Sequence, residues 1–143
     1  MPEVAFLLFS CLLLLCKDLV AQNPVNWTNN DLIKPAELAS ILKINENLPV
    51  IFSVGPGALI IHSIDIGMVK DEKNLAEFKE QLSKLPKSTN IIVYCGCCPY
   101  AHCPNLRPAI ATLQNMKFTN YHLLDLPNNI KTDWVSKGYP VRQ

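Results

Sequence analysis

Four cysteines are packed into nine consecutive residues in the second half of the chain. This thiol cluster comprises Cys95, Cys97, Cys98 and Cys103, and His102 adds an imidazole beside it. Thiolates and imidazole are suitable ligands for Cu(I) or Zn(II). The spacing C-x-C-C-x4-C, however, is not that of a standard zinc knuckle. The haem-attachment motif C-x-x-C-H does not occur. The same thiols could instead form a short disulfide between Cys103 and either Cys97 or Cys98. Residue types alone leave metal binding and thiol chemistry both open.

Cys95 has a position of its own within the cluster. It directly follows residues 90–94 (NIIVY), a continuous apolar run that predicts a strand at the centre of a parallel sheet covered on both faces. The carboxyl ends of such strands are where open α/β sheets bind ligands. Loop amides and the N-terminus of a following helix lower the pKa of a thiol there. We therefore expect Cys95 to be a reactive thiolate that can carry a persulfide.

The elements that must position Cys95 follow an alternating pattern of helix-like and strand-like segments. Helical periodicity predicts helices over residues 34–43, 73–85, 107–116 and 130–137. Apolar runs predict extended segments over residues 49–54, 58–67, 90–94 and 121–126. This alternation predicts an α/β fold, with one central parallel sheet and helices on both of its faces.

We interpret the N-terminal segment as a targeting signal. Residues 4–16 are almost continuously apolar, but thirteen residues are fewer than the roughly 20 that a helix needs to cross a bilayer. We expect a signal peptide over residues 1–21, cleaved after Ala21, and a mature domain over residues 22–143. Lipidation at Cys11 or Cys16 is an alternative. The cleaved protein would be exported, periplasmic or secreted, with no membrane attachment, and Asn26 would begin a glycosylation sequon.

Composition excludes several classes of protein. The chain has 143 residues, of which 49% are hydrophobic, and 13 basic against 12 acidic side chains give a net charge of +1. This length and composition fit one compact domain with its own core. A nearly neutral chain with scattered basic residues gives no electrostatic basis for binding nucleic acid. The four clustered cysteines are too close together to cross-link the fold as disulfides do in small exported domains.

Several segments together resemble a known family. The runs IIVYC (91–95), LRPAIATLQNMKF (106–118), YHLLDL (121–126) and DWVSKGYPV (133–141) are similar to the C-terminal half of a rhodanese-like domain. The run YCGCCPYAHCPNLRPA (94–109) is similar to an exported rhodanese-like subgroup with a Cys-rich active-site loop. The resemblance extends over residues 28–143 and implies a single rhodanese-like domain.

The resemblance also implies a function. Cys95 matches the cysteine that accepts a sulfane sulfur from a donor such as thiosulfate and passes it to a thiol acceptor. Arg107 is the matching candidate for the arginine that pairs with the anionic donor. Trp134 and Gly138 match the family's closing pattern and imply packing and a helix cap. We expect a monomeric sulfurtransferase that needs no cofactor.

Two departures from the family pattern keep rival functions open. Eleven residues separate Cys95 from Arg107, and Ser53-Val54-Gly55 replaces the family's acidic-x-Arg motif. The main rival is a non-catalytic module that binds Cu or Zn, or acts as a thiol redox module, through the thiol cluster. Its ligands would be Cys95, Cys97, Cys98 and Cys103. A third alternative is a binding domain that keeps only the fold.

Overall fold

The computed structural model describes residues 27–143, so the predicted signal peptide and the sequon residue Asn26 lie outside the described residues. Five strands form one sheet in the order β1-β5-β4-β2-β3, and each neighbouring pair is parallel. The strands are β1 (Leu32–Ile33), β2 (Val50–Ser53), β3 (Ile64–Asp65), β4 (Ile91–Tyr94) and β5 (Tyr121–Leu124). The predicted α/β class with a central parallel sheet is confirmed.

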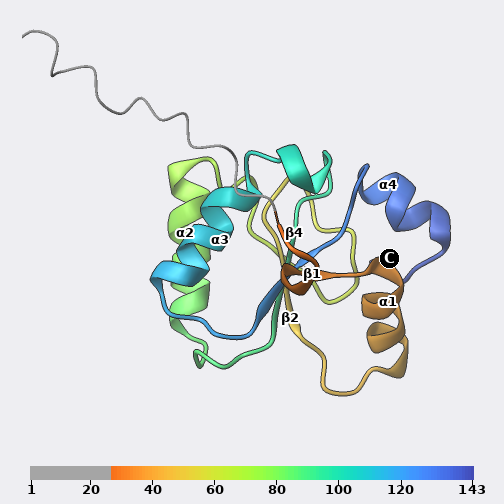
Figure 1. Ribbon diagram of the computed structural model, residues 1–143, viewed down its shortest axis with the longest axis horizontal. Helices are drawn as coiled ribbons and strands as arrows, with labels where there is room; N and C mark the ends of the chain where they lie inside the picture. Colours follow the sequence, from red (N-terminus) through yellow and green to blue (C-terminus); the bar gives the residue numbers. More distant parts are fainter. Residues whose placement is uncertain (1–26) are drawn as a thin grey trace, which may run out of the picture.

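Helices cover both faces of the sheet, as expected. They are α1 (Pro35–Ile44), α2 (Glu72–Ser83), α3 (Leu106–Asn115) and α4 (Ile130–Asp133). The short 3-10 helices are η1 (Asn29–Asp31), η2 (Tyr100–His102) and η3 (Val135–Lys137). In Figure 1, α2 and α3 lie together on one side of the strands, and α1 and α4 lie on the other side. None of the helices within residues 27–143 has the length and apolar character needed to cross a membrane.

The central strand β4 divides the core into two halves. Successive side chains of a strand point to opposite faces of the sheet. Ile91 and Val93 therefore join the cluster beneath α2 and α3, whereas Ile92 and Tyr94 join the cluster beneath α1 and α4. Cys95 continues this alternation and lies in the α2 and α3 half of the core. The strand periodicity thus directs the Cys95 thiol toward the beginning of α3.

The extended segment predicted over residues 58–67 is wrong in its length. Only Ile64 and Asp65 form a strand, while Ile60 makes an isolated bridge to Val141. Between them the chain turns, because the Ser63 hydroxyl and the Ser63 N–H both donate to the Ile60 carbonyl oxygen. His62, expected in a strand, has a φ of 64° in this turn. A serine that bonds nearby backbone offers the chain an alternative to the sheet ladder.

Two further elements differ from expectation. The strand β1 was not predicted, since two residues are too few to show a period. The helix predicted over 130–137 is divided into α4 and η3, which meet at Trp134. The expected cap is confirmed, because Gly138 follows η3 with a φ of 70°. Trp134 is fully buried and donates from Nε1 to the Pro140 carbonyl oxygen, 2.9 Å away.

Candidate functional site

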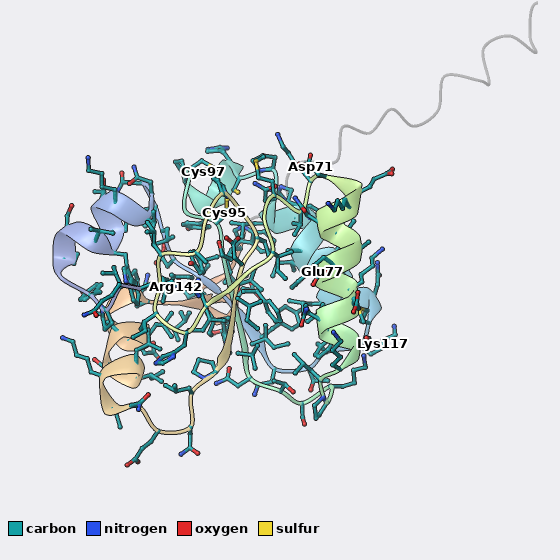
Figure 2. All side chains as sticks on the ribbon, turned by 180° about the vertical axis from the view of Figure 1, so that it is seen from behind. Asp71, Glu77, Cys95, Cys97, Lys117 and Arg142 are labelled. Carbon is teal, nitrogen blue, oxygen red and sulfur yellow. The ribbon has the colours of Figure 1, made fainter. Side chains whose placement is uncertain are left out.

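The fold brings the four thiols of the cluster together at one end of the sheet. Their four Sγ atoms all lie within 4.8 Å of one another and could together hold a metal ion. The Sγ atom of Cys97 lies 3.4 Å from that of Cys95 and 3.1 Å from that of Cys98. All four are free cysteines, so neither of the considered disulfides is formed. Figure 2 shows Cys95 and Cys97 at the end of the molecule where the strands stop.

The thiols differ sharply in their access to solvent. Cys95 is 1% exposed and Cys103 is 2% exposed. Cys98 is half-buried, and Cys97 is exposed. The cluster therefore runs from an exposed thiol at Cys97 to two thiols inside the core.

Neighbouring elements hold the loop that carries the cluster. The Gly96 carbonyl accepts from the N–H of Ile130 at the start of α4, at 3.0 Å. The N–H of Tyr100 donates to the Leu126 carbonyl, after β5, at 3.1 Å. Cys97 and Cys98 lie between these two attachments, so the loop presents them at a fixed place above Cys95.

The end of β2 passes directly against Cys95. A Cβ atom built on Gly55 would lie 2.3 Å from the Cys95 Sγ atom and 3.3 Å from its Cα atom. No side chain can be added at that distance without displacing the sulfur. The segment Ser53-Val54-Gly55, which departs from the family pattern, thus supplies the close approach on which the position of Cys95 depends.

Asn105 is a site residue that the sequence analysis missed. It is 1% exposed, and its Nδ2 atom donates to the Cys95 Sγ atom at 3.6 Å. Its Oδ1 atom accepts from the backbone N–H of Lys70 at 3.1 Å. An Asn just before a helix suggests a capping residue, but this side chain makes no capping hydrogen bond to α3. The sequence carried no other signal for its contact with sulfur.

Hydrogen bonds favour negative charge on Cys95. The Cys103 thiol has the largest effect, and the backbone N–H and thiol of Cys97 and the Asn105 amide add to it. Together they outweigh burial and lower the pKa of Cys95 from 9.0 to about 5. Burial and hydrogen bonding to its neighbours raise the pKa of Cys97 to about 12. The pKa of the Cys103 thiol is also raised, chiefly by its interaction with Cys95 and then by burial. The cluster therefore concentrates one thiolate charge on Cys95.

Arg107 lies in the first turn of α3, and its guanidinium carbon is 5.6 Å from the ring centroid of Trp27. This is a cation–π contact with the segment that leads into η1. Arg107 as a whole is half-buried at the start of the helix. Its role toward an anionic donor stays a prediction.

His102 lies at the end of η2 and is exposed. The group of candidate metal ligands found within residues 27–143 consists of thiols alone. The imidazole considered in the sequence analysis is therefore not part of that group.

Comparison with known proteins supports the fold and goes no further. No protein-family model matches the chain, and no curated protein matches it. Among solved structures, the chain is similar to a crystal structure of a protein from Lactobacillus plantarum, a structural genomics target, with a TM-score of 0.59. The match covers 100% of both chains at 13% sequence identity. At that identity the likeness concerns the fold alone.

Proposed function

We propose that the protein is a sulfurtransferase that carries sulfane sulfur as a persulfide on Cys95. The observation that carries this proposal is the environment of the Cys95 sulfur. It is a buried thiol at the carboxyl end of the central strand, it accepts a hydrogen bond from the Asn105 amide, and the neighbouring Cys103 and Cys97 lower its pKa. A thiolate is the nucleophilic form of cysteine, and these donors stabilise it below neutral pH.

The proposed reaction begins with a donor such as thiosulfate. The Cys95 thiolate attacks the outer sulfur of thiosulfate, a sulfur–sulfur bond forms, and the bond to the sulfonate sulfur breaks. Sulfite leaves with the electron pair of the broken bond, and the negative charge passes to the outer sulfur of the new persulfide. Arg107 is the proposed partner of the anionic donor, since a guanidinium can hold two oxygens of such a group at once.

Export is part of the same proposal. Residues 1–21 would be removed, and the remaining chain would act as a monomer in the periplasm or outside the cell. The support is the thirteen-residue apolar run of the sequence, which is too short to cross a bilayer of ordinary thickness.

The replacement Cys95→Ser tests the assignment of the nucleophile. It exchanges one sulfur for oxygen and should leave the fold intact, whereas uptake of sulfur from thiosulfate should be lost. After a brief exposure to thiosulfate, before any later step on the persulfide, mass spectrometry of the intact protein should show an increase of about 32 Da in the wild type and none in the variant. The matched control is Cys98→Ser, which removes a thiol of the same loop and should keep the mass increase. Full sulfur uptake by Cys95→Ser would show that the nucleophile is another residue.

A specific observation also favours a second candidate, a module that binds Cu(I) or Zn(II). Zinc–sulfur bonds of about 2.3 Å in a tetrahedron place the sulfurs about 3.8 Å apart. The measured Sγ separations of 3.1 and 3.4 Å, and the upper bound of 4.8 Å for the group, lie within about an ångström of that spacing. Small movements of the thiols would be enough to enclose a metal.

Two measurements on one sample separate the candidates. The triple variant Cys97→Ser, Cys98→Ser and Cys103→Ser keeps Cys95 but removes three candidate ligands. A metal module should lose its metal completely in this variant, because the remaining thiol cannot close the coordination shell. A sulfurtransferase should still accept one sulfur on Cys95. One combination of results would leave only the metal module. Elemental analysis would find metal in the wild type and none in the variant, and neither protein would carry a persulfide.

A further inference from the structure

We propose that Cys103 is a built-in acceptor that attacks the persulfide on Cys95, releasing sulfide and forming a disulfide between Cys95 and Cys103. This inference rests on the proposed function and names the acceptor of that same site. It assigns the protein a specific net activity, the conversion of sulfane sulfur to sulfide, with an external dithiol needed to restore the two thiols.

The first support is the closeness of the two buried sulfurs. Cys95 and Cys103 are both buried, and their two Sγ atoms lie within 4.8 Å of one another. A disulfide bond is about 2.05 Å long, so the sulfurs must approach by less than about 3 Å. Between the Tyr100 attachment and Cys103 lie the exposed residues Ala101 and His102. A movement at these two residues would bring the Cys103 sulfur to Cys95 without opening the sheet.

The second support is the burial of Cys95. Any external reactant, thiosulfate included, must displace the covering loop to reach this 1% exposed sulfur, whereas Cys103 is already beside it. A reactant held next to its target reacts at a high effective concentration. The first acceptor to reach the inner sulfur of a persulfide on Cys95 should therefore be Cys103.

Cys103 is better placed for this role than Cys97. Only Gly96 separates Cys97 from Cys95, so a disulfide between them would close a very small ring. The hydrogen bond from Ile130 to Gly96 further restrains that segment. Seven residues separate Cys95 from Cys103, which leaves enough chain for ordinary disulfide geometry.

A persulfide on Cys95 changes what the Cys103 thiol faces. Once Cys95 carries the added sulfur, the negative charge lies on the outer sulfur atom rather than on the Cys95 Sγ atom. The Cys103 proton then has a new acceptor beside it.

The step balances without any other reactant. The Cys103 sulfur forms a bond to the Cys95 Sγ atom, and the bond from that atom to the outer sulfur breaks. The outer sulfur leaves as hydrosulfide, taking the electron pair of the broken bond and the proton of the Cys103 thiol. The outer sulfur is reduced to sulfide, and the two cysteines are oxidised to a disulfide. A dithiol then reduces the disulfide and becomes a cyclic disulfide itself.

The test adds one equivalent of thiosulfate to the reduced protein without oxygen, and compares wild type, Cys103→Ser and Cys98→Ser. Sulfide is quantified, and peptide mass spectrometry locates disulfides and persulfides. Wild type and Cys98→Ser should release one sulfide for each disulfide between Cys95 and Cys103. Cys103→Ser should release none, and its persulfide on Cys95 should last roughly tenfold longer or more. A sample without thiosulfate should form no disulfide.

The remaining outcomes decide against the inference in distinguishable ways. A persulfide on Cys95 that lasts equally in wild type and Cys103→Ser, without sulfide, would overturn the role of Cys103 and leave sulfur transfer standing. Added sulfur found on Cys103 without a disulfide would overturn it too, as would the loss of sulfide release in Cys98→Ser. No added sulfur on Cys95 in any protein would remove the proposed function itself. If Cys103→Ser does not fold, Cys103→Ala and the disulfide mapping of the wild type carry the same test.

Discussion

Cys95 combines two properties that usually oppose one another, burial and negative charge. Burial alone raises the pKa of a thiol, because it removes water from the charged form. Here the donors from Cys103, Cys97 and Asn105 reverse that effect. At the scale of single residues, the reactivity of the site is therefore a matter of which donors surround one sulfur atom.

The charge on Cys95 predicts a pH dependence of its titration and of stability. The thiolate should titrate near pH 5, against 9.0 for an ordinary thiol, when ultraviolet absorbance of the wild type is compared with that of Cys95→Ser. Because the pKa is lower in the folded state, this thiolate stabilises the fold fully above pH 9 and loses its contribution as the pH falls through about 5. Urea unfolding should therefore show that the free energy of unfolding of the wild type, relative to that of Cys95→Ser, increases as the pH rises from about 5 to 9. An equal midpoint difference at all pH values would contradict the assigned charge.

Asn105→Ala should remove two hydrogen bonds that link separate parts of the site. It removes the donor to the Cys95 sulfur and the acceptor for the Lys70 N–H. We expect a loss of about 1 kcal/mol in the free energy of unfolding and a rise in the pKa of Cys95. The control is Asn115→Ala, an exposed residue at the end of the same helix, which should change neither. An unchanged Cys95 titration in Asn105→Ala would show that the amide does not act on the sulfur.

At the scale of elements, the site depends on two adjacent strands that end together. The strands β2 and β4 are paired in parallel, with Ser53 opposite Tyr94. The chain leaving β2 therefore meets the chain leaving β4 at Gly55 and Cys95. The helix α3 begins eleven residues after Cys95, and Asn105, just before it, returns to the same point. The sulfur is thus held by three segments that are distant from one another in the sequence.

Gly55→Ala tests this contact between strand ends. The new methyl group would lie 2.3 Å from the Cys95 Sγ atom, so the sulfur or the strand must move. We expect a destabilisation of about 1–3 kcal/mol and slower sulfur uptake by Cys95. In a Cys95→Ala background the same replacement should cost less, because the nearest atom is gone while the contacts at 3.3 Å remain. Equal unfolding costs in the two backgrounds would show that the sulfur is not the limiting contact.

At the scale of the whole molecule, the described domain begins at Trp27, the sixth residue of the proposed mature chain. Trp27 packs against the core beneath α2 and α3, and Arg107 lies over its ring. Thr28 and Asp31 form a capping box at η1. The Trp27 contact joins this segment to the helix that carries Arg107.

Processing and truncation should therefore have different effects. N-terminal sequencing of exported protein should give Gln22, and a chain beginning there should unfold cooperatively and elute as a monomer. A chain beginning at Asn29 lacks Trp27 and Thr28, and should lose about 1–3 kcal/mol of stability because an aromatic side chain no longer packs on the core. The two chains should be compared by urea unfolding. Equal stability would mean that Trp27 adds nothing to the fold.

The sequence by itself determined the features that depend on local periodicity. The apolar run before Cys95 predicted β4, and the 3.6-residue periods predicted α1, α2 and α3 to within about two residues at either end. The alternation of these elements was enough to predict a parallel sheet covered on both faces. The same reasoning failed over residues 58–67, because the apolar Ile60, in an isolated bridge just before a turn, is buried as completely as it would be in a strand.

Only the tertiary structure decided what surrounds the Cys95 sulfur. The spacing of the cysteines predicted a cluster but not that Cys103 would be buried beside Cys95 while Cys97 stays exposed. Gly55 and Asn105 reach that sulfur through the pairing of β2 with β4 and the packing of α3, which no local pattern reports. The strength of a hydrogen bond and the cost of burying a charge both depend on distances between segments far apart in the chain. The cysteine motif supplies most of the donors, and folding decides which thiol they surround and therefore which one carries the charge.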